Sequence, residues 1–257
     1  MSNTYIESYV EDQIGVIQLN RPDVLNALNR QMIGEIVEKL EKYDEDDNVR
    51  VIIMKGNARA FAAGADIEEM IDETPLTMEL QDPFAVWDRI TLINKPIIAA
   101  VNGVALGGGF ELALHCDLIV SGESAKFGFP EVKLGVMPGA GGTQLLTKAI
   151  GKRKALEWIW LGEQMSAQEA MNLGAINRVV ADELVVEETF RLANQLKNQA
   201  PISLRLIKEA VKVADETPLM DGMKLERKNF YLTFASDDQK EGMKAFTEKR
   251  SPSFKGV

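Results

Sequence analysis

Residues 101–117, VNGVALGGGFELALHCD, contain three consecutive glycines followed by a glutamate inside an otherwise apolar stretch. The apolar run at 96–101 is short, partly β-branched and bounded by turn residues, which predicts a buried strand. Residues 110–116 are predicted to form a helix. At a strand-to-helix turn, glycines let a ligand approach the backbone, and the first helical N–H groups point toward that ligand. The segment therefore indicates a site for an anion, or for an oxygen that becomes one.

Glu111 is expected in the first turn of this helix, where the helix dipole favours an ionised carboxylate. A carboxylate beside an anion-stabilising turn points to acid-base chemistry. The alternative is that the glycines only allow tight packing and that Glu111 is solvated, and a glycine cluster alone favours this alternative. No Gly-x-Gly-x-x-Gly fits over 103–112 and no Gly-x-x-x-x-Gly-Lys-Ser/Thr occurs, so nucleotide-phosphate folds have no support.

Composition restricts the class of protein. The chain has 257 residues, 46% of them hydrophobic, which predicts one large domain or one domain with a small appendage. Its net charge of −10 argues against a nucleic-acid or anionic-membrane partner. The single cysteine, Cys116, excludes an internal disulfide framework and fits a reducing compartment. The start, MSNTYIESYVED, has no signal core or presequence, and no apolar run is long enough to span a membrane, so we expect a cytoplasmic protein.

Strands and helices alternate in the first part of the chain, and helices dominate the rest. Apolar runs predict strands at 5–10, 14–19, 51–54, 96–101, 118–121 and 176–180. A helix from Asn29 to the acidic loop at 44–48 has one apolar face. Further helices are predicted at 84–93, 110–116, 143–150, 152–160, 166–173, 182–199, 201–214 and 217–247. We predict a sheet-based core at 1–195 followed by a helical region at 196–257.

Several expectations concern the segments between these elements. The small-residue loop at 55–66, KGNARAFAAGAD, is a second place where backbone can approach a ligand closely. Pro75 and Pro83 are expected to interrupt helical patches in 67–87, and Thr143 is expected to be an N-cap. Residues 126–144 read as a second loop system.

Glu131 is distinguished by its apolar neighbours Phe127, Phe129, Pro130 and Val132. Desolvation raises the pKa of a carboxyl group, so Glu131 could hold a proton and act as an acid while Glu111 stays ionised. Two carboxyl groups with separated pKa values can position water and move its protons. The alternative is that Glu131 caps a loop or pairs with Lys126 or Lys133, and composition alone leaves the two interpretations about even.

His115 lies four residues after Glu111 and can share its helical face. This spacing resembles half a metal site, but no further ligand is indicated, so a packed or hydrogen-bonded structural histidine is favoured. A Ser-His-Asp hydrolase would need the same histidine, and no Gly-x-Ser-x-Gly occurs. Cys116, in an apolar helix, is expected in the core.

Five sequence motifs occur in order along the chain. They are LNRPDVLNAL (19–28), AFAAGADI (60–67), KPIIAAVNGVALGGGFELALHCD (95–117), FGFPEVKLGVMPGAGGTQ (127–144) and DDQKEGMKAFTEKRSPSF (237–254). In these motifs and their spacing the chain resembles the crotonase (enoyl-CoA hydratase/isomerase) family, and within it most closely the hydratases. The resemblance spans essentially the whole chain. It implies an α/β fold with a spiral core of repeated strand-strand-helix units, and trimers that often pair into hexamers.

The resemblance also implies an active site. The backbone N–H groups of Ala65 and Gly108 match the two donors to the thioester oxygen, and such donors stabilise an enolate. Glu111 and Glu131 match the two catalytic glutamates that hold and split water. Gly139 matches a position that bounds the water site.

Coenzyme A contacts follow from the same matches. The implied CoA-binding residues are Val24, Ala63, Ala65, Asp66, Ile67, Glu68, Gly108, Phe230 and Lys249. Phe230 and Lys249 match positions that reach CoA commonly from a neighbouring subunit. Asp23 and Glu68 occupy positions that are often lysine in hydratases, so two cationic contacts to CoA phosphates are replaced by acidic residues. The usual Thr-Gln-Arg-Leu is Thr-Gln-Leu-Leu here, with Leu145 in place of arginine.

The implied reaction is reversible syn addition of water to a trans-2-enoyl-CoA, giving a 3-hydroxyacyl-CoA, in β-oxidation of fatty acids or related acyl-CoA degradation. It implies no metal and no cofactor besides the CoA of the substrate. Acyl-chain preference is expected to rest on 67–95, including Met70, Leu80, Phe84 and Trp87, whose alternative role is core packing. Enoyl-CoA isomerisation remains an alternative activity. An RNA-binding relative would need a basic stripe that this chain lacks, and a trimerising scaffold would leave the paired glutamates unexplained.

Overall fold

The computed structural model describes residues 4–214 and 216–257 and contains two β-sheets. The larger sheet has the order β1-β2-β3-β5-β7-β10, with β1 antiparallel to β2 and the other pairs parallel. Its strands are β1 (Ile6–Glu11), β2 (Ile14–Leu19), β3 (Val51–Lys55), β5 (Ile97–Val101), β7 (Leu118–Gly122) and β10 (Arg178–Val180). The smaller sheet consists of β4 (Ala60–Ala62), β6 (Val104–Leu106), β8 (Lys126–Gly128) and β9 (Gln164–Ser166), parallel except for β9.

The chain alternates between the two sheets. After β3 in the larger sheet comes β4 in the smaller one, and β5–β6 and β7–β8 repeat the step, with helical segments between the pairs. The expected spiral of strand-strand-helix units is therefore confirmed. The predictions of a loop at 55–66 and of a loop system at 126–144 missed a three-residue strand of the smaller sheet in each segment. Strands this short have no recognisable alternation.

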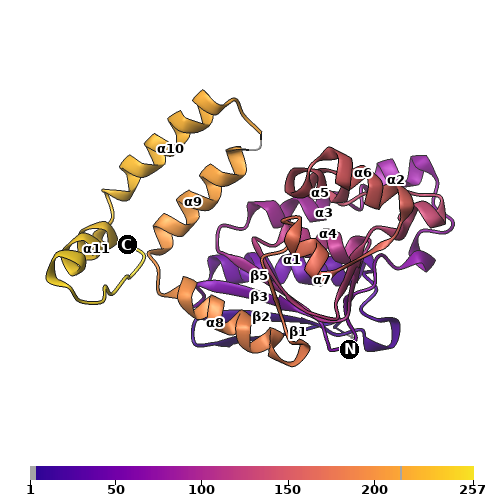
Figure 1. Cartoon of the computed structure of the whole chain (residues 1–257), viewed down its shortest axis with the longest axis horizontal. Helices are drawn as coiled ribbons and strands as arrows, with labels where there is room; N and C mark the ends of the chain where they lie inside the picture. Colours follow the sequence, from indigo (N-terminus) through magenta and orange to yellow (C-terminus); the bar gives the residue numbers. More distant parts are fainter. Residues whose placement is uncertain (1–3, 215) are drawn as a thin grey trace.

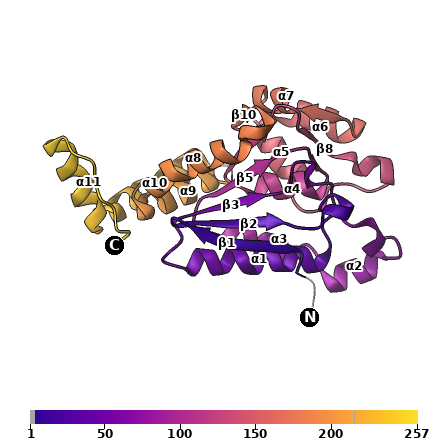
Figure 2. The same ribbon diagram turned by 90° about the horizontal axis from the view of Figure 1, so that it is seen from below.

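Helices cover both faces of the larger sheet, as Figure 2 shows for α1 (Arg30–Glu45) on one side and α8 (Val185–Lys197) on the other. Alternate strand residues belong to two separate hydrophobic clusters, one containing the apolar face of α1 and the other that of α8. Both faces of parallel strands are thus buried, which explains why their sequences are continuous apolar runs. Asn29 caps α1 as expected, accepting a hydrogen bond from the Met32 amide.

The other helices agree with the sequence-based ranges except at five points. They are α2 (Pro75–Gln81), α3 (Ala85–Asp88), α4 (Gly108–His115), α5 (Gly142–Ile150), α6 (Lys152–Leu161), α7 (Ala167–Asn172), α9 (Pro201–Ala214), α10 (Leu219–Thr233) and α11 (Asp237–Glu248). The helix predicted at 110–116 begins two residues earlier. Gly141, in the left-handed conformation, is the N-cap of α5 in place of Thr143. Pro75 begins α2 instead of interrupting it, since Pro is tolerated at the first helical position.

The single helix predicted at 217–247 is two helices. Ser236 is the N-cap of α11, and its side chain accepts a hydrogen bond from the Gln239 amide. The segment predicted as a helix at 84–93 divides into α3 and the 3-10 helix Arg89–Leu92. A polar cap such as Ser236 stops a helix without interrupting the apolar periodicity, so periodicity alone cannot detect it.

The C-terminal helices α9, α10 and α11 extend away from the sheets (Figure 1). Lys208 attaches α9 to the core, because its Nζ donates to Asp117 Oδ2 (2.7 Å) and to the Lys95 carbonyl (3.0 Å).

The division into a core at 1–195 and a helical region at 196–257 remains a prediction. In the described part of the chain, no helix is both long and apolar enough to cross a membrane. The first three residues of the N-terminal stretch considered above lie outside the described residues.

Helix α4 packs directly on the smaller sheet through Gly109. A Cβ atom at this position would lie 2.1 Å from the Ala62 carbonyl oxygen of β4, so only glycine allows this approach. Gly109 and its neighbour Phe110 are buried. The contact therefore determines how closely the N-terminal end of α4 approaches β4.

We predict that Gly109→Ala lowers the free energy of unfolding by about 1–3 kcal/mol, since a Cβ against a strand backbone overpacks the interior. Gly34→Ala is the matched control, because Gly34 also lies within a helix but a Cβ there would meet nothing within 4 Å. That control should raise stability by about 0.5–1 kcal/mol through helix propensity. Urea unfolding curves measure both, and equal effects of the two substitutions would contradict the packing argument.

Candidate active site

Two backbone amides lie side by side at the start of α4. Gly108 is the first residue of the helix, and Ala65 follows β4. An ideal Cβ on Gly108 would lie 3.5 Å from the Ala65 nitrogen. Among the described residues, neither amide donates a hydrogen bond, whereas the neighbouring Gly107 amide donates to the Gly128 carbonyl (2.9 Å). The Ala65 and Gly108 amides are therefore available to an external acceptor.

Each of the three consecutive glycines has a different structural role. Gly107 has a φ of +49°, and a Cβ there would lie 2.8 Å from Glu131 Oε1. Gly108 leaves the space beside Ala65 open. Gly109 permits the packing described above, so the packing interpretation of the glycine cluster is right for one of its members.

Glu111 is buried, with 3% of its surface exposed. Its Oε1 accepts hydrogen bonds from the Ala140 and Gly142 amides, both at 2.8 Å. Burial raises the pKa of Glu111, and these two amide hydrogen bonds oppose the rise. The position in the first helical turn was the sequence-based reason to expect an ionised group, but in the structure the two loop amides are what favours the carboxylate.

Glu131 lies in the 3-10 helix Pro130–Leu134, beside the fully buried rings of Phe127 and Phe129. Its Oε2 is buried, with no hydrogen-bond partner among the described residues. Burial raises the pKa of Glu131 to about 7, with an opposing hydrogen bond from its own backbone amide and a further rise from the charge of Glu111. In the described part of the chain it forms no ion pair with Lys126 or Lys133.

His115 is a hydrogen-bonded structural histidine, as the sequence favoured. Its Nε2 lies 2.8 Å from the Ala140 carbonyl oxygen, and its ring centroid lies 6.1 Å from that of Trp87. Cys116 is buried, and burial raises the pKa of its thiol, which keeps it protonated and unreactive. Residues 4–214 and 216–257 contain no cluster of three His, Cys, Asp or Glu side chains that could hold a metal ion.

The segments around Val24 and Ala63–Asp66 form one rim next to these amides. The Ala63 amide donates to the Leu25 carbonyl (3.0 Å), and the Asp66 amide donates to the Leu28 carbonyl (2.9 Å). Asp66 also pairs with Arg21 at 3.0 Å. Ile67 and Glu68 continue the rim as exposed residues of a 3-10 helix.

Two of the expected CoA-binding residues are not near this rim. Phe230 lies on α10 with 58% of its surface exposed, and Lys249 ends α11 in the left-handed conformation. Both elements extend away from α4 within one chain (Figure 1). Within the monomer, the structure therefore does not bring them to the glutamate pair.

A cavity of about 280 Å³ opens beside Ala65. Met70, Phe84 and Trp87 line it, as their expected role in acyl-chain selection requires, whereas Leu80 is 76% exposed and is not among the lining residues. Gly139 is adjacent to the same wall, since a Cβ on it would lie 2.6 Å from the Phe84 ring.

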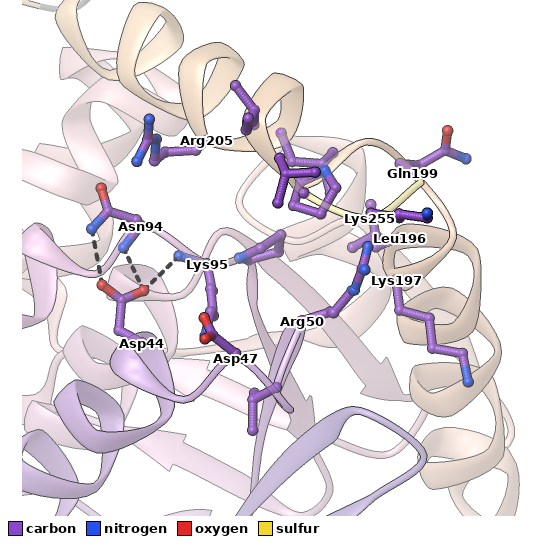
Figure 3. Close-up of a pocket in the computed structure, with 17 residues that line it drawn as sticks. Asp44, Asp47, Arg50, Asn94, Lys95, Leu196, Lys197, Gln199, Arg205 and Lys255 are labelled. Atoms are coloured by element: carbon purple, nitrogen blue, oxygen red, sulfur yellow. Dashed lines mark hydrogen bonds between the residues drawn. The ribbon is translucent and has the colours of Figure 1, made fainter. Parts of the chain in front are cut away.

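A larger cavity, of about 470 Å³, lies elsewhere, between the end of α1, the α8–α9 connection and the C-terminal tail (Figure 3). Its lining is strongly charged, but most of its polar groups have partners. Lys95 donates to the Tyr43 and Asp46 carbonyls, both at 2.7 Å, and Asp44 accepts from the Asn94 amide. It shares no lining residue with the cavity beside Ala65.

The chain matches a known protein family over almost its whole length. The family model described as enoyl-CoA hydratase/isomerase matches residues 10–257. The chain belongs to this family. Among its relatives, a probable enoyl-CoA hydratase of Mycobacterium tuberculosis is 46% identical over 95% of both chains. The 2,3-dehydroadipyl-CoA hydratase of Escherichia coli is 43% identical over 96% of both.

Solved structures of the family agree with the fold. A Geobacillus kaustophilus protein named "Enoyl-CoA Hydrates Subunit I" is 61% identical, covers 99% of both chains and superposes with a TM-score of 0.97. The enoyl-CoA hydratase of Bacillus anthracis is 35% identical, covers 99% of this chain and 100% of its own, and gives a TM-score of 0.93. This enoyl-CoA hydratase/isomerase family member is thus a hydratase-like enzyme with a crotonase fold, and its family implies an acyl-CoA substrate.

The residues that sequence reasoning missed are the backbone donors to Glu111. The loop at 139–142 of this family member was predicted only as a glycine-rich loop, with Gly139 as the position beside the water. Yet the Ala140 and Gly142 amides are the groups that contact the carboxylate. The structure shows why residue 142 is a glycine, because a Cβ there would lie 3.0 Å from Glu111 Oε1, but the sequence alone carries no signal for this contact.

We predict that Glu131→Gln changes how stability depends on pH. Because the folded-state pKa of about 7 lies above the ordinary value of 4.5, the stability contributed by the protonated carboxyl is fully present below about pH 4.5 and is lost as the pH rises through about 7. The variant lacks this titration. Its stability relative to the unsubstituted protein should therefore increase from pH 4.5 to pH 8, as measured by urea unfolding. Parallel pH profiles for the two proteins would contradict the raised pKa.

Proposed function

We propose that this protein catalyses the reversible syn addition of water to trans-2-enoyl-CoA thioesters, giving 3-hydroxyacyl-CoA. The observation that carries the proposal is the pairing of two carboxyl groups, the buried Glu111 and the half-buried Glu131, with two free amides, Ala65 and Gly108. A site with donors for an oxyanion and two proton-transfer groups matches the needs of this reaction.

The Ala65 and Gly108 amides would donate hydrogen bonds to the thioester carbonyl oxygen. Water attack at C3 moves electrons toward that oxygen, so donors fixed by β4 and α4 stabilise the enolate without reorganisation. Removing one such donor typically lowers turnover by about a hundred- to a thousandfold. No metal is required in this scheme, because the thioester already makes C3 electrophilic.

The two glutamates have different roles in the proposal. Glu111, with Oε1 held by two amides, is oriented to take a proton from water as it attacks C3. Glu131, whose pKa of about 7 leaves much of it protonated near neutral pH, supplies the proton that reaches C2. Gly139 would bound the water between them. An isomerase needs only one such acidic group, so the presence of two favours hydration.

Binding of CoA is proposed along the rim formed by Val24 and Ala63–Glu68. The acidic Asp23 and Glu68 leave backbone groups as the main contacts there. We further propose a homotrimer, or a dimer of trimers, in which Phe230 and Lys249 of a neighbouring subunit complete the site. Large exposed apolar side chains on the C-terminal helices support such an assembly: Ile207, Val211, Leu219, Met220, Tyr231, Leu232, Phe234, Met243 and Phe246. A place in fatty-acid β-oxidation and a cytoplasmic location remain part of the proposal.

Glu111→Gln and Glu131→Gln should each reduce hydration of crotonyl-CoA by about a hundred- to ten-thousandfold while the protein stays folded, since each removes one acid-base group. Loss of the enoyl-thioester absorbance measures the reaction, and circular dichroism checks the fold. Near-normal turnover in either variant would remove that residue from the mechanism. An unsubstituted protein that leaves crotonyl-CoA unchanged at high enzyme concentration would refute the proposed function.

The cavity beside Ala65 suggests which acyl groups are hydrated. Its wall is apolar near Met70 and Phe84, but its lining also includes Asp66, Glu69 and Asp82. The one cation in the lining, Arg30, already bonds Glu73 and Gln81. A neutral acyl chain suits such a cavity, whereas a terminal carboxylate would face like charges. This favours enoyl-CoA over the dicarboxylic substrate named for the Escherichia coli relative.

We predict that kcat/KM for trans-2-hexenoyl-CoA exceeds that for 2,3-dehydroadipyl-CoA by at least about tenfold. The second substrate carries a terminal carboxylate where the first has a methyl group, and this carboxylate meets like charges in the protein. Glu69→Gln combined with Asp82→Asn should narrow the ratio. Glu79→Gln, on the exposed side of α2, is the control and should leave it unchanged. A ratio near one in the unsubstituted protein would contradict the preference for neutral chains.

A further inference from the structure

The single histidine of the chain has a defined hydrogen-bonding partner near the site. His115 lies in the last turn of α4, four residues after Glu111, and its Nε2 is 2.8 Å from the Ala140 carbonyl oxygen. A carbonyl oxygen can only accept a hydrogen bond, so Nε2 carries the proton. In the neutral ring this leaves Nδ1 unprotonated, which fixes the tautomer.

The residue that His115 contacts is also bound to Glu111. The Ala140 amide donates to Glu111 Oε1. Two side chains of α4 therefore bind Ala140, with Glu111 at its N–H and His115 at its carbonyl oxygen. Ala140 is only 6% exposed, and solvent cannot readily replace a lost partner of its carbonyl. Next to it, Gly141 has a φ of +104° and leads to Gly142, the second amide donor to Glu111.

We propose that His115 is a positioning residue for hydration, whose Nε2–H holds the Ala140 carbonyl and thereby keeps the Ala140 and Gly142 amides on Oε1 of Glu111. The inference rests on the proposed function, since it assigns the histidine a part in that reaction. His115 contacts neither the oxyanion donors nor Glu131. It acts on Glu111 through the loop.

The surroundings of the ring keep it neutral. Burial lowers the pKa of His115, and Lys212 on α9 lowers it further, while its hydrogen bond to Ala140 and the charge of Asp88 on α3 oppose this. Lys212 is itself held by a bond to the Thr91 carbonyl (2.6 Å). The imidazole thus lies between Trp87 of α3 and the Ala140 carbonyl of the loop.

A spectroscopic test is possible without any assay of activity, because the chain has only one histidine. Nitrogen-15 labelling of histidine gives the signals of a single imidazole in the full-length protein. We expect the Nε2–H tautomer at neutral pH and a titration midpoint below the ordinary value for histidine. An Nδ1–H tautomer would overturn the proposal.

Kinetics test the link to Glu111. His115→Phe keeps an aromatic ring beside Trp87 but removes the donor, whereas His115→Gln places an amide N–H where Nε2 was. We expect kcat on crotonyl-CoA to fall about tenfold in His115→Phe with KM within about twofold, and to recover in His115→Gln. Because the loop amides lower the pKa of Glu111, loosening them should also move the acid limb of the kcat–pH profile to higher pH in the Phe variant only.

Controls separate this role from packing. Cys116→Ala truncates the next side chain of α4, whose Sγ bonds the Leu112 carbonyl and not the loop, and it should leave the kcat–pH profile unchanged. Thermal unfolding verifies that each variant is folded. Equal losses in the Phe and Gln variants, or an unmoved acid limb in the Phe variant, would overturn the role of His115. An inactive unsubstituted protein would overturn the proposed function as well, so the two failures are distinguishable.

Discussion

The absence of a side chain at Gly109 is the constraint on which the site depends. With no Cβ, α4 can lie against the Ala62 carbonyl of β4, a distance that any other residue would prevent. Ala65 is three residues beyond Ala62, and Gly108 is the residue before Gly109, so this one contact brings the two free amides together. The Gly107–Gly128 hydrogen bond then places β8, and with it the chain that leads to Glu131. The smaller sheet therefore aligns three separate segments of the chain at a single helix end.

The two carboxyl groups illustrate how burial and hydrogen bonding together set the pKa of an acidic side chain. Glu111 is buried and Glu131 is half-buried, and burial raises the pKa of each. Glu111 receives two backbone hydrogen bonds on one oxygen, whereas Glu131 has a buried oxygen without a partner among the described residues. The difference therefore comes from the loop at 139–142 and not from the residue type or the degree of burial alone.

The sequence predicted the larger sheet and most helices well, because long apolar runs and amphipathic periodicity are local signals. It failed for β4, β6, β8 and β9, whose three residues each are held by pairing with distant strands. Of the candidate site, the sequence drew attention to Glu131 through its aromatic neighbours and to Glu111 through its helix position, but packing and capping alternatives stayed open until the family resemblance selected these two glutamates. The backbone donors at Ala140 and Gly142 could not, since an amide has no letter in the sequence and only the fold shows what it contacts.

The buried thiol of Cys116 has a consequence for how this protein responds to oxidants. Burial keeps the sulfur protonated, so it is a poor nucleophile toward peroxide or disulfides. The exposed sulfur atoms are thioethers, among them that of Met137, which is 68% exposed in the chain between Glu131 and Ala140. Oxidative damage would therefore fall on methionine, as a sulfoxide that reductases can reverse, in the loop of the candidate site.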